Sequence, residues 1–139
     1  PFNRLGEATG GLCGGNLSIL YSLTGTDADI FTNDKVLFIE DLDEYLYHID
    51  RMMVNLKRSG KLRGLAGLVV GGMSDMRDNT IGFGQNAMEI IHEAVAEYNY
   101  PVCFDFPAGH QGDNLALIMG RKVTLMVEEG GSTLRFESK

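Results

Sequence analysis

The sequence predicts a single α/β domain with a mainly parallel β-sheet, flanking helices and a run of short strands at the C-terminal end. Short continuous apolar segments alternate with amphipathic segments up to residue 106, as in buried parallel strands connected by helices. Beyond residue 106 the apolar segments are short and separated by glycine, which indicates strands joined by tight turns. The chain has 139 residues, 44% of them apolar, and no internal repeat or long linker, so we expect one globular domain.

The first half of the chain contains one predicted strand between two predicted helices. Residues 6–26 are rich in glycine and then become apolar, so we expect a turn followed by a short helix that begins near Asn16, a favourable N-cap residue. Residues 35–40 form a short apolar run that is typical of a buried parallel strand. Residues 41–60 are the clearest helix, because they open with acidic side chains, close with glycine and place apolar side chains at helical spacing: Tyr45, Ile49, Met52 and Leu56.

The second half continues this alternation and ends in strands. Residues 64–73 are predicted to form another buried strand, and residues 86–99 a second amphipathic helix. The apolar residues 101–106 are expected to form a third strand. Three more short strands are predicted in the last part of the chain: 115–120, 122–129 and 133–138. The expected result is a parallel sheet that an antiparallel ribbon completes.

Charge and cysteine content exclude several classes of function. The chain has 12 basic and 19 acidic residues, which give a net charge of −7, and its basic cluster at residues 57–63 is explained by a helix C-terminus and its exit turn. We therefore expect neither nucleic acid nor a membrane as a partner. Cys13 and Cys103 lack metal-ligand spacing, so we expect two reduced thiols in a cytoplasmic protein. Because the chain begins without methionine, we expect a fragment of a longer protein.

Two side chains at predicted strand ends could carry chemistry. Glu40 ends the strand at residues 35–40, and His110 lies in the loop after residues 101–106. The carboxyl ends of parallel strands form the crevice in which α/β proteins bind ligands. If the two strand ends are neighbours, the carboxylate can orient the imidazole, and only a nucleophile is missing from a triad. The alternatives are an ordinary loop histidine and, for Glu40, complementarity to a helix dipole that it would share with Asp41, Asp43 and Glu44.

Other candidate residues have simpler interpretations. Ser74 follows a predicted strand in a glycine turn that resembles a nucleophile elbow, but the second glycine of G-x-S-x-G is absent. We prefer the interpretation that Ser74 or Asp75 caps a polar turn. His48 and His92 lie in the two amphipathic helices without a paired histidine, which favours partly exposed helix residues over metal ligands.

Four segments of the chain carry a resemblance to a known family. They are GEATGGLCGGNLSIL, VLFIEDLDEYLYHIDRMMVNLKRSG, GLVVGGMSD and FPAGHQGDNLALIMGRKVTL. Together, in this order and over nearly the whole chain, they resemble the C-terminal domain of the LD-carboxypeptidase family of serine peptidases. That family includes muropeptide tetrapeptide carboxypeptidases and microcin C immunity peptidases. This chain departs from the family after NLAL, where proline is usual and Ile118 and Met119 stand here.

The resemblance implies a fold, a site and an activity. It implies a three-layer, swivelling-type α/β domain over residues 1–139, and a separate N-terminal domain that carries the serine nucleophile. It makes Glu40 the triad acid and His110 the general base, and it leaves Ser74 outside the site. The implied reaction releases the C-terminal residue of a murein tetrapeptide or a related acyl amide, with no metal and no organic cofactor. The resemblance also implies a homodimer and a role in bacterial peptidoglycan recycling.

We therefore expect the C-terminal half of a serine LD-carboxypeptidase that is catalytically incomplete alone. The alternative is a non-catalytic binding or interaction module on the same scaffold. The triad assignment requires Glu40 and His110 to lie at one edge of the sheet, within about 2.6–3.2 Å for a working hydrogen bond. We expect an exposed His110 in a mobile loop, because the N-terminal domain would normally cover this edge.

Overall fold

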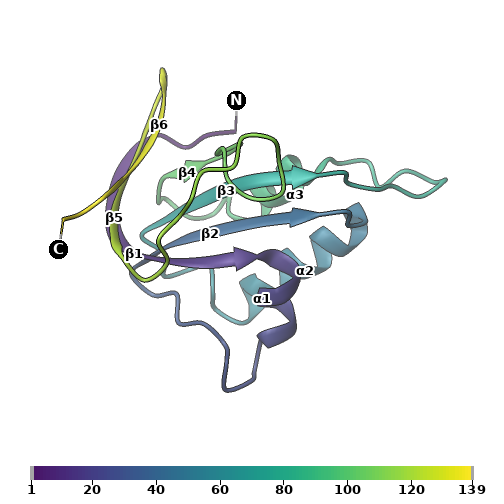
Figure 1. The fold of residues 1–139 in the computed structure, drawn as a ribbon. Helices are drawn as coiled ribbons and strands as arrows, with labels where there is room; N and C mark the ends of the chain where they lie inside the picture. Colours follow the sequence, from purple (N-terminus) through teal and green to yellow (C-terminus); the bar gives the residue numbers. More distant parts are fainter. Residues whose placement is uncertain (1, 139) are drawn as a thin grey trace.

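A six-stranded mixed sheet organises the chain in the computed structural model, which describes residues 2–138 (Figure 1). The strands are β1 (Gly6–Asn16), β2 (Lys35–Leu42), β3 (Gly67–Ser74), β4 (Val102–Cys103), β5 (Lys122–Glu128) and β6 (Gly131–Phe136). Their order across the sheet is β4-β3-β2-β1-β5-β6. The first four strands are parallel, whereas β5 and β6 pair antiparallel, as the sequence predicts.

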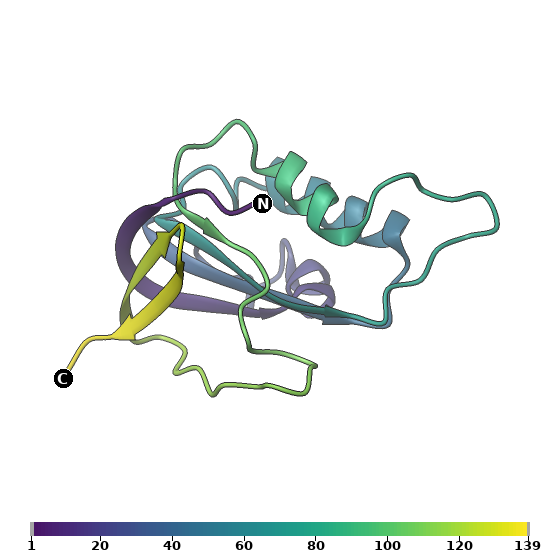
Figure 2. The ribbon, with the colours of Figure 1, turned by 90° about the horizontal axis from the view of Figure 1, so that it is seen from above.

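Two hydrophobic cores lie on opposite faces of the sheet. One core joins the sheet to three helices: α1 (Leu17–Leu23), α2 (Leu46–Arg58) and α3 (Ala87–Ala94). The second core lies beneath the loop of residues 107–121 and the curled β5–β6 hairpin, on the side away from α2 and α3 (Figure 2). The α/β class is confirmed. The expected layering differs, because a loop and a hairpin rather than helices cover the second face.

The sheet curls until it nearly forms a barrel. Arg4, just before β1, makes an antiparallel bridge with Val102 in β4, the strand at the far edge. The Arg4 guanidinium donates to the carbonyl oxygens of Val95 and Tyr100, at 2.9 and 3.2 Å. These contacts connect the start of the chain to the last parallel strand, so the sheet is closed by long-range contacts as well as by strand pairing.

Residues 6–16 are a strand, and the predicted turn is wrong. β1 pairs with β2 on one side and β5 on the other. A Cβ atom on Gly10 would lie 2.4 Å from the carbonyl oxygen of Asp34, and one on Gly14 would lie 1.9 Å from that of Phe38. Glycine therefore permits a close backbone approach here, which is one of its recognised uses within strands.

The loop of residues 107–121 contains a second error of prediction. The strand expected at 115–120 is absent, and Leu117 is the large apolar side chain of this segment that packs against the second core. The strand expected at 101–106 is reduced to Val102–Cys103. Three apolar side chains of the loop remain substantially exposed: Leu115, Ile118 and Met119.

The remaining predicted elements are confirmed with adjusted ends. Asn16 is the N-cap of α1, where its side chain accepts a hydrogen bond from the Ile19 N–H at 3.1 Å. The helix predicted at 86–99 begins after Asn86, which forms a capping box with Glu89, and is shorter than expected. The apolar side chains of α2 at helical spacing are buried: Ile49, Met52 and Leu56. None of the helices within residues 2–138 is long and apolar enough to cross a membrane.

Candidate active site

Glu40 and His110 meet at the carboxyl edge of the parallel strands. Glu40 lies near the end of β2 with 7% of its side chain exposed, whereas 54% of the His110 side chain is exposed. The imidazole Nδ1 lies 2.7 Å from Glu40 Oε2, and the His110 backbone N–H donates to the same oxygen at 3.3 Å. The contact that the triad assignment requires is therefore present.

The loop of residues 107–121 reaches Glu40 by crossing the end of β3. The Gly72 N–H donates to the carbonyl oxygen of Ala108 at 2.9 Å. The Ser74 hydroxyl donates to the main-chain carbonyl of His110. These bonds carry the chain from β4 over β3 to β2, and they explain how a residue beyond β4 meets a carboxylate two strands away.

Gly109 makes this close approach possible. Its φ is +105°, a conformation that favours glycine. A Cβ atom at this position would lie 2.8 Å from Glu40 Cβ and 3.0 Å from Glu40 Oε2. The glycine before His110 is thus part of the site geometry, and no local sequence pattern distinguishes it from the other glycines of the chain.

Glu40 affects both the pKa of His110 and the choice of ring nitrogen that carries the proton. The hydrogen bond with Glu40 and the negative charge of that residue raise the pKa of His110, and the charge of Asp41 adds a smaller contribution. An ionised carboxylate can only accept a hydrogen bond, so Nδ1 carries a proton and the neutral ring presents its lone pair on Nε2. Across residues 2–138, Nε2 has no hydrogen-bond partner. It can therefore take a proton from a group that approaches this edge.

Asn16 contacts the other oxygen of Glu40. Its Nδ2 donates to Glu40 Oε1 at 3.3 Å and to Asp41 Oδ1 at 3.1 Å. Asp41, only 2% exposed, also accepts from the backbone N–H of Ser18 at 3.0 Å and from the Ser18 hydroxyl at 2.6 Å. Sequence reasoning assigned Asn16 only a capping role, because its position opposite Glu40 depends on strand pairing.

The dipole alternative does not apply to Glu40. α2 begins at Leu46 and has no acidic residue in its first turn. Asp43 instead binds Arg77, with 2.7 Å between Oδ2 and the guanidinium Nη2, and Glu44 Oε2 lies 2.8 Å from His48 Nδ1. The acidic segment after β2 therefore forms specific contacts at the sheet edge rather than facing the N-terminus of α2.

Other candidate residues lie apart from the Glu40–His110 contact. The Ser74 hydroxyl, at the end of β3, donates to the His110 main-chain carbonyl rather than to the imidazole, and this long-range bond is not the turn cap that we preferred. His92 is half-buried in α3. Cys13 is partly buried and Cys103 is buried, and both thiols are free. In the described part of the chain, no group of three or more His, Cys, Asp or Glu side chains could hold a metal ion.

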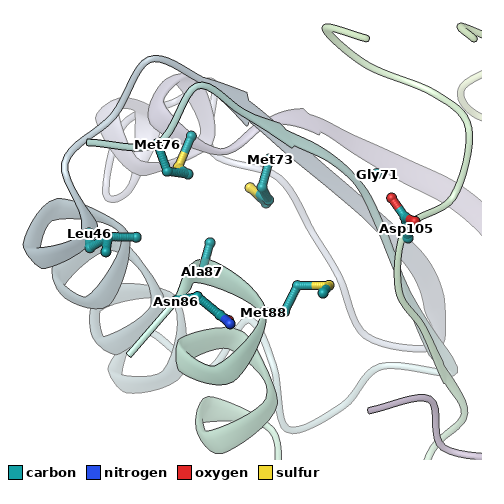
Figure 3. A pocket seen from close by; sticks show the side chains of 8 residues that line it. All are labelled: Leu46, Gly71, Met73, Met76, Asn86, Ala87, Met88 and Asp105. Atoms are coloured by element: carbon teal, nitrogen blue, oxygen red, sulfur yellow. The ribbon is translucent and has the colours of Figure 1, made fainter. Parts of the chain in front are cut away.

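A cavity of about 480 Å³ opens between the end of β3 and the N-terminal ends of α2 and α3 (Figure 3). Its lining is mostly apolar and rich in methionine: Leu46, Gly71, Met73, Met76, Asn86, Ala87, Met88 and Asp105. Glu40 and His110 do not line it. The cavity and the carboxylate–imidazole pair are therefore separate features.

Comparison with known proteins identifies the family. Residues 9–125, which include both Glu40 and His110, match the family described as LD-carboxypeptidase C-terminal domain. The chain belongs to this family. The resemblance seen in the sequence is thereby confirmed.

Curated relatives of this LD-carboxypeptidase domain are considerably longer than it is. The "Probable murein peptide carboxypeptidase" of Bacillus subtilis (strain 168) is 36% identical over 128 residues, which are 89% of this chain and 39% of the relative. The "Murein tetrapeptide carboxypeptidase" of Pseudomonas aeruginosa is 27% identical over 130 residues, which are 90% of this chain and 42% of the relative. The domain thus spans about two fifths of these proteins.

Solved structures agree with the fold of the domain. The muramoyltetrapeptide carboxypeptidase from Oxalobacter formigenes matches with a TM-score of 0.84 and 30% identity, over 98% of this chain and 47% of that one. The microcin C7 self-immunity protein MccF, in complex with glutamyl sulfamoyl guanosine, matches with a TM-score of 0.83 and 22% identity, over 98% and 40%. At this identity, the likeness to MccF concerns the fold alone.

Proposed function

We propose that this domain supplies the acid and the general base of a serine-type LD-carboxypeptidase, with Glu40 orienting His110. The observation that carries the proposal is the 2.7 Å contact between His110 Nδ1 and Glu40 Oε2 at the exposed sheet edge. The nucleophilic serine and the oxyanion donors would come from a part of the enzyme outside this chain. Three relatives named as carboxypeptidases support this division of residues between two parts of the enzyme. They are 27–36% identical to this domain, and the domain covers only 39–47% of their length.

The proposed mechanism follows from the protonation state of the ring. His110 Nε2 takes the proton of the serine hydroxyl as the serine oxygen attacks the carbonyl carbon of the substrate. Glu40 stabilises the imidazolium that forms. When the tetrahedral intermediate collapses, Nε2–H gives its proton to the departing amine and the C–N bond breaks. Water then attacks the acyl-serine with His110 again acting as base, which releases the shortened peptide and restores the enzyme.

We propose a murein tetrapeptide as the substrate, and a C-terminal D-amino acid as the released product. The names of the Pseudomonas and Oxalobacter relatives support this class. The described residues leave the His110 side chain 54% exposed, so an enclosed substrate pocket would need a further wall from the rest of the enzyme. That further wall would also exclude water from the reacting groups.

The test uses the full-length protein that carries this domain. D-Alanine release from L-alanyl-γ-D-glutamyl-diaminopimelyl-D-alanine should fall by about 10⁴-fold in Glu40→Gln and by about 10⁶-fold in His110→Gln, the losses expected for the acid and the base of a catalytic triad. His92→Gln, a half-buried histidine outside the site, should keep wild-type activity. Full activity in both site variants would contradict the proposal.

The isolated chain provides a second test. It should release no D-alanine, because it contains the base and the acid without their proposed nucleophile. Turnover by the isolated chain that disappears in Ser74→Ala would make Ser74 the nucleophile and overturn this division of roles. Tetrapeptide binding by the full-length protein without any release would instead favour a non-catalytic binding module.

A further inference from the structure

We propose that Asn16 is a positioning residue, which holds the Glu40 carboxylate in the orientation in which Oε2 accepts a hydrogen bond from His110. The consequence for catalysis rests on the proposed function. The positioning itself is a property of this chain, and it can be measured without substrate.

Two elements of backbone fix Asn16. It is the last residue of β1, where it lies directly opposite Glu40 in the parallel pairing with β2. It is also the N-cap of α1, and its Oδ1 accepts the Ile19 N–H at 3.1 Å. Because Oδ1 faces this N–H donor, Nδ2 must face the carboxylates. The amide orientation thus follows from the helix cap.

A β-bulge lies beside the point where two carboxylates meet the same amide. Neighbouring residues of a regular strand point to opposite faces of the sheet. The pairing of β2 with β3 shifts register between Ile39 and Asp41, which are the residues on either side of Glu40. The side chains of Glu40 and Asp41 both reach Asn16 Nδ2, at 3.3 and 3.1 Å. Between the pairs Ile39–Val70 and Asp41–Met73, β3 advances three positions while β2 advances two, so the extra residue lies in β3 and the bulge beside Glu40 is part of the site.

Glu40 depends on Asn16 more than Asp41 does. Asp41 also accepts from the Ser18 backbone and hydroxyl and from the Leu42 N–H at 2.8 Å. Within residues 2–138, the hydrogen bond to Glu40 Oε1 comes from Asn16 alone, and the other partner of Glu40 is His110 through Oε2. Without the amide, Oε1 would be free and the carboxylate could turn away from the imidazole.

The amide also separates two buried like charges. Glu40 and Asp41 are 6% and 2% exposed, and both accept a hydrogen bond from Asn16 Nδ2, so the amide lies between two buried carboxylates. The charged groups around Glu40 are His110 from the loop and Asp41 on the same strand, with Glu44 one step beyond through the Ser18 hydroxyl. Loss of the Asn16 donor should therefore weaken the Glu40–His110 contact in two ways. The Glu40 carboxylate would lose its fixed orientation, and the repulsion between Glu40 and Asp41 would no longer be offset by a shared donor.

The test compares Asn16→Ser with Asn16→Ala. Serine keeps an N-cap acceptor but loses the donor to the carboxylates, whereas alanine loses both. NMR titration of the His110 imidazole in this chain should show a lower pKa than wild type in both variants. The midpoint of urea unfolding should fall further in Asn16→Ala. Asn16→Asp, which keeps the cap and adds a third carboxylate, is the second cap-preserving variant if the serine variant is poorly folded.

In the full-length enzyme, Asn16→Ser should lower kcat by about 10–100-fold with little change in KM, a loss of the size seen when a residue that orients a metal ligand is removed. A wild-type His110 titration together with wild-type kcat in Asn16→Ser would overturn the proposal. If Glu40→Gln leaves activity intact while Asn16→Ser still shifts the titration, the proposed function fails and the positioning role stands.

Discussion

The ionisation of His110 follows from its contact with Glu40. Because the hydrogen bond and the negative charge of Glu40 raise the pKa of His110, Glu40→Gln should lower it. NMR titration of the imidazole measures this shift directly. A His110 pKa that is unchanged in Glu40→Gln would show that the contact is absent in solution.

The same raised pKa predicts a pH dependence of stability. A group whose pKa is higher in the folded state than in the unfolded state stabilises the fold most fully below the unfolded pKa, about 6.5 for histidine. Its contribution is lost as the pH rises through the folded pKa of His110. The difference in urea stability between wild type and His110→Gln should therefore be larger at pH 5 than at pH 9. His92→Gln, which leaves the Glu40–His110 contact intact, serves as the control.

The conformation of Gly109 decides whether His110 can reach Glu40. Gly109→Ala would combine a positive φ with a Cβ atom 2.8 Å from Glu40 Cβ, so we expect a cost of about 1–3 kcal/mol in stability and loss of the raised His110 pKa. Urea unfolding and NMR measure these two effects. Gly112→Ala in the same loop is the matched control, because nothing lies within 4 Å of its Cβ position.

At the scale of elements, β1 exists because its glycines accept a neighbouring backbone. Gly10→Ala would place Cβ 2.4 Å from the Asp34 carbonyl oxygen, and we expect it to lower the free energy of unfolding by more than about 2 kcal/mol. The adjacent Gly11→Ala meets only the flexible Lys35 side chain, at 3.2 Å, and should be nearly neutral. Equal urea stabilities of the two variants would contradict this explanation of the strand.

The ends of three parallel strands converge on the candidate site. β1 contributes Asn16, β2 contributes Glu40, and β3 contributes Ser74, which bonds to the His110 main chain. Each strand end thus either orients a functional group or anchors the loop that carries one. This arrangement follows the general rule that functional groups of α/β folds gather at the carboxyl ends of strands.

At the scale of the whole molecule, we expect the isolated chain to self-associate. The loop of residues 107–121 exposes Leu115, Ile118 and Met119 by 55%, 48% and 44%. Sedimentation velocity at several concentrations should detect dimers or larger species, and their fraction should rise with salt, which screens the repulsion between chains of charge −7.

Serine at these three positions should return the chain to a monomer. Ile81→Ser, in the loop between β3 and α3, is the control and should leave association unchanged. A monomer at all concentrations would contradict both the association and the homodimer that the family resemblance implies. Dissociation by Ile81→Ser alone would place the contact on another surface.

Local patterns determined much of this protein. Apolar runs identified β2, β3, β5 and β6, helical spacing identified α2, and the preference of Asn for N-caps identified the start of α1. Glu40 was found because it ends an apolar run and His110 because it follows one, and the family resemblance gave them roles that remain proposals. These features can be predicted locally because they depend on which residues within a single helix or strand are apolar.

Only the tertiary structure decided the rest. The glycines of β1 read as a turn until the backbone of residues 34–38 is placed beside them. Asn16 reaches Glu40 from 24 residues away, and His110 reaches it from 70, through strand register, a bulge and a loop that crosses β3. Such contacts depend on which segments lie side by side, and the periodicity of a single segment carries no information about its neighbours.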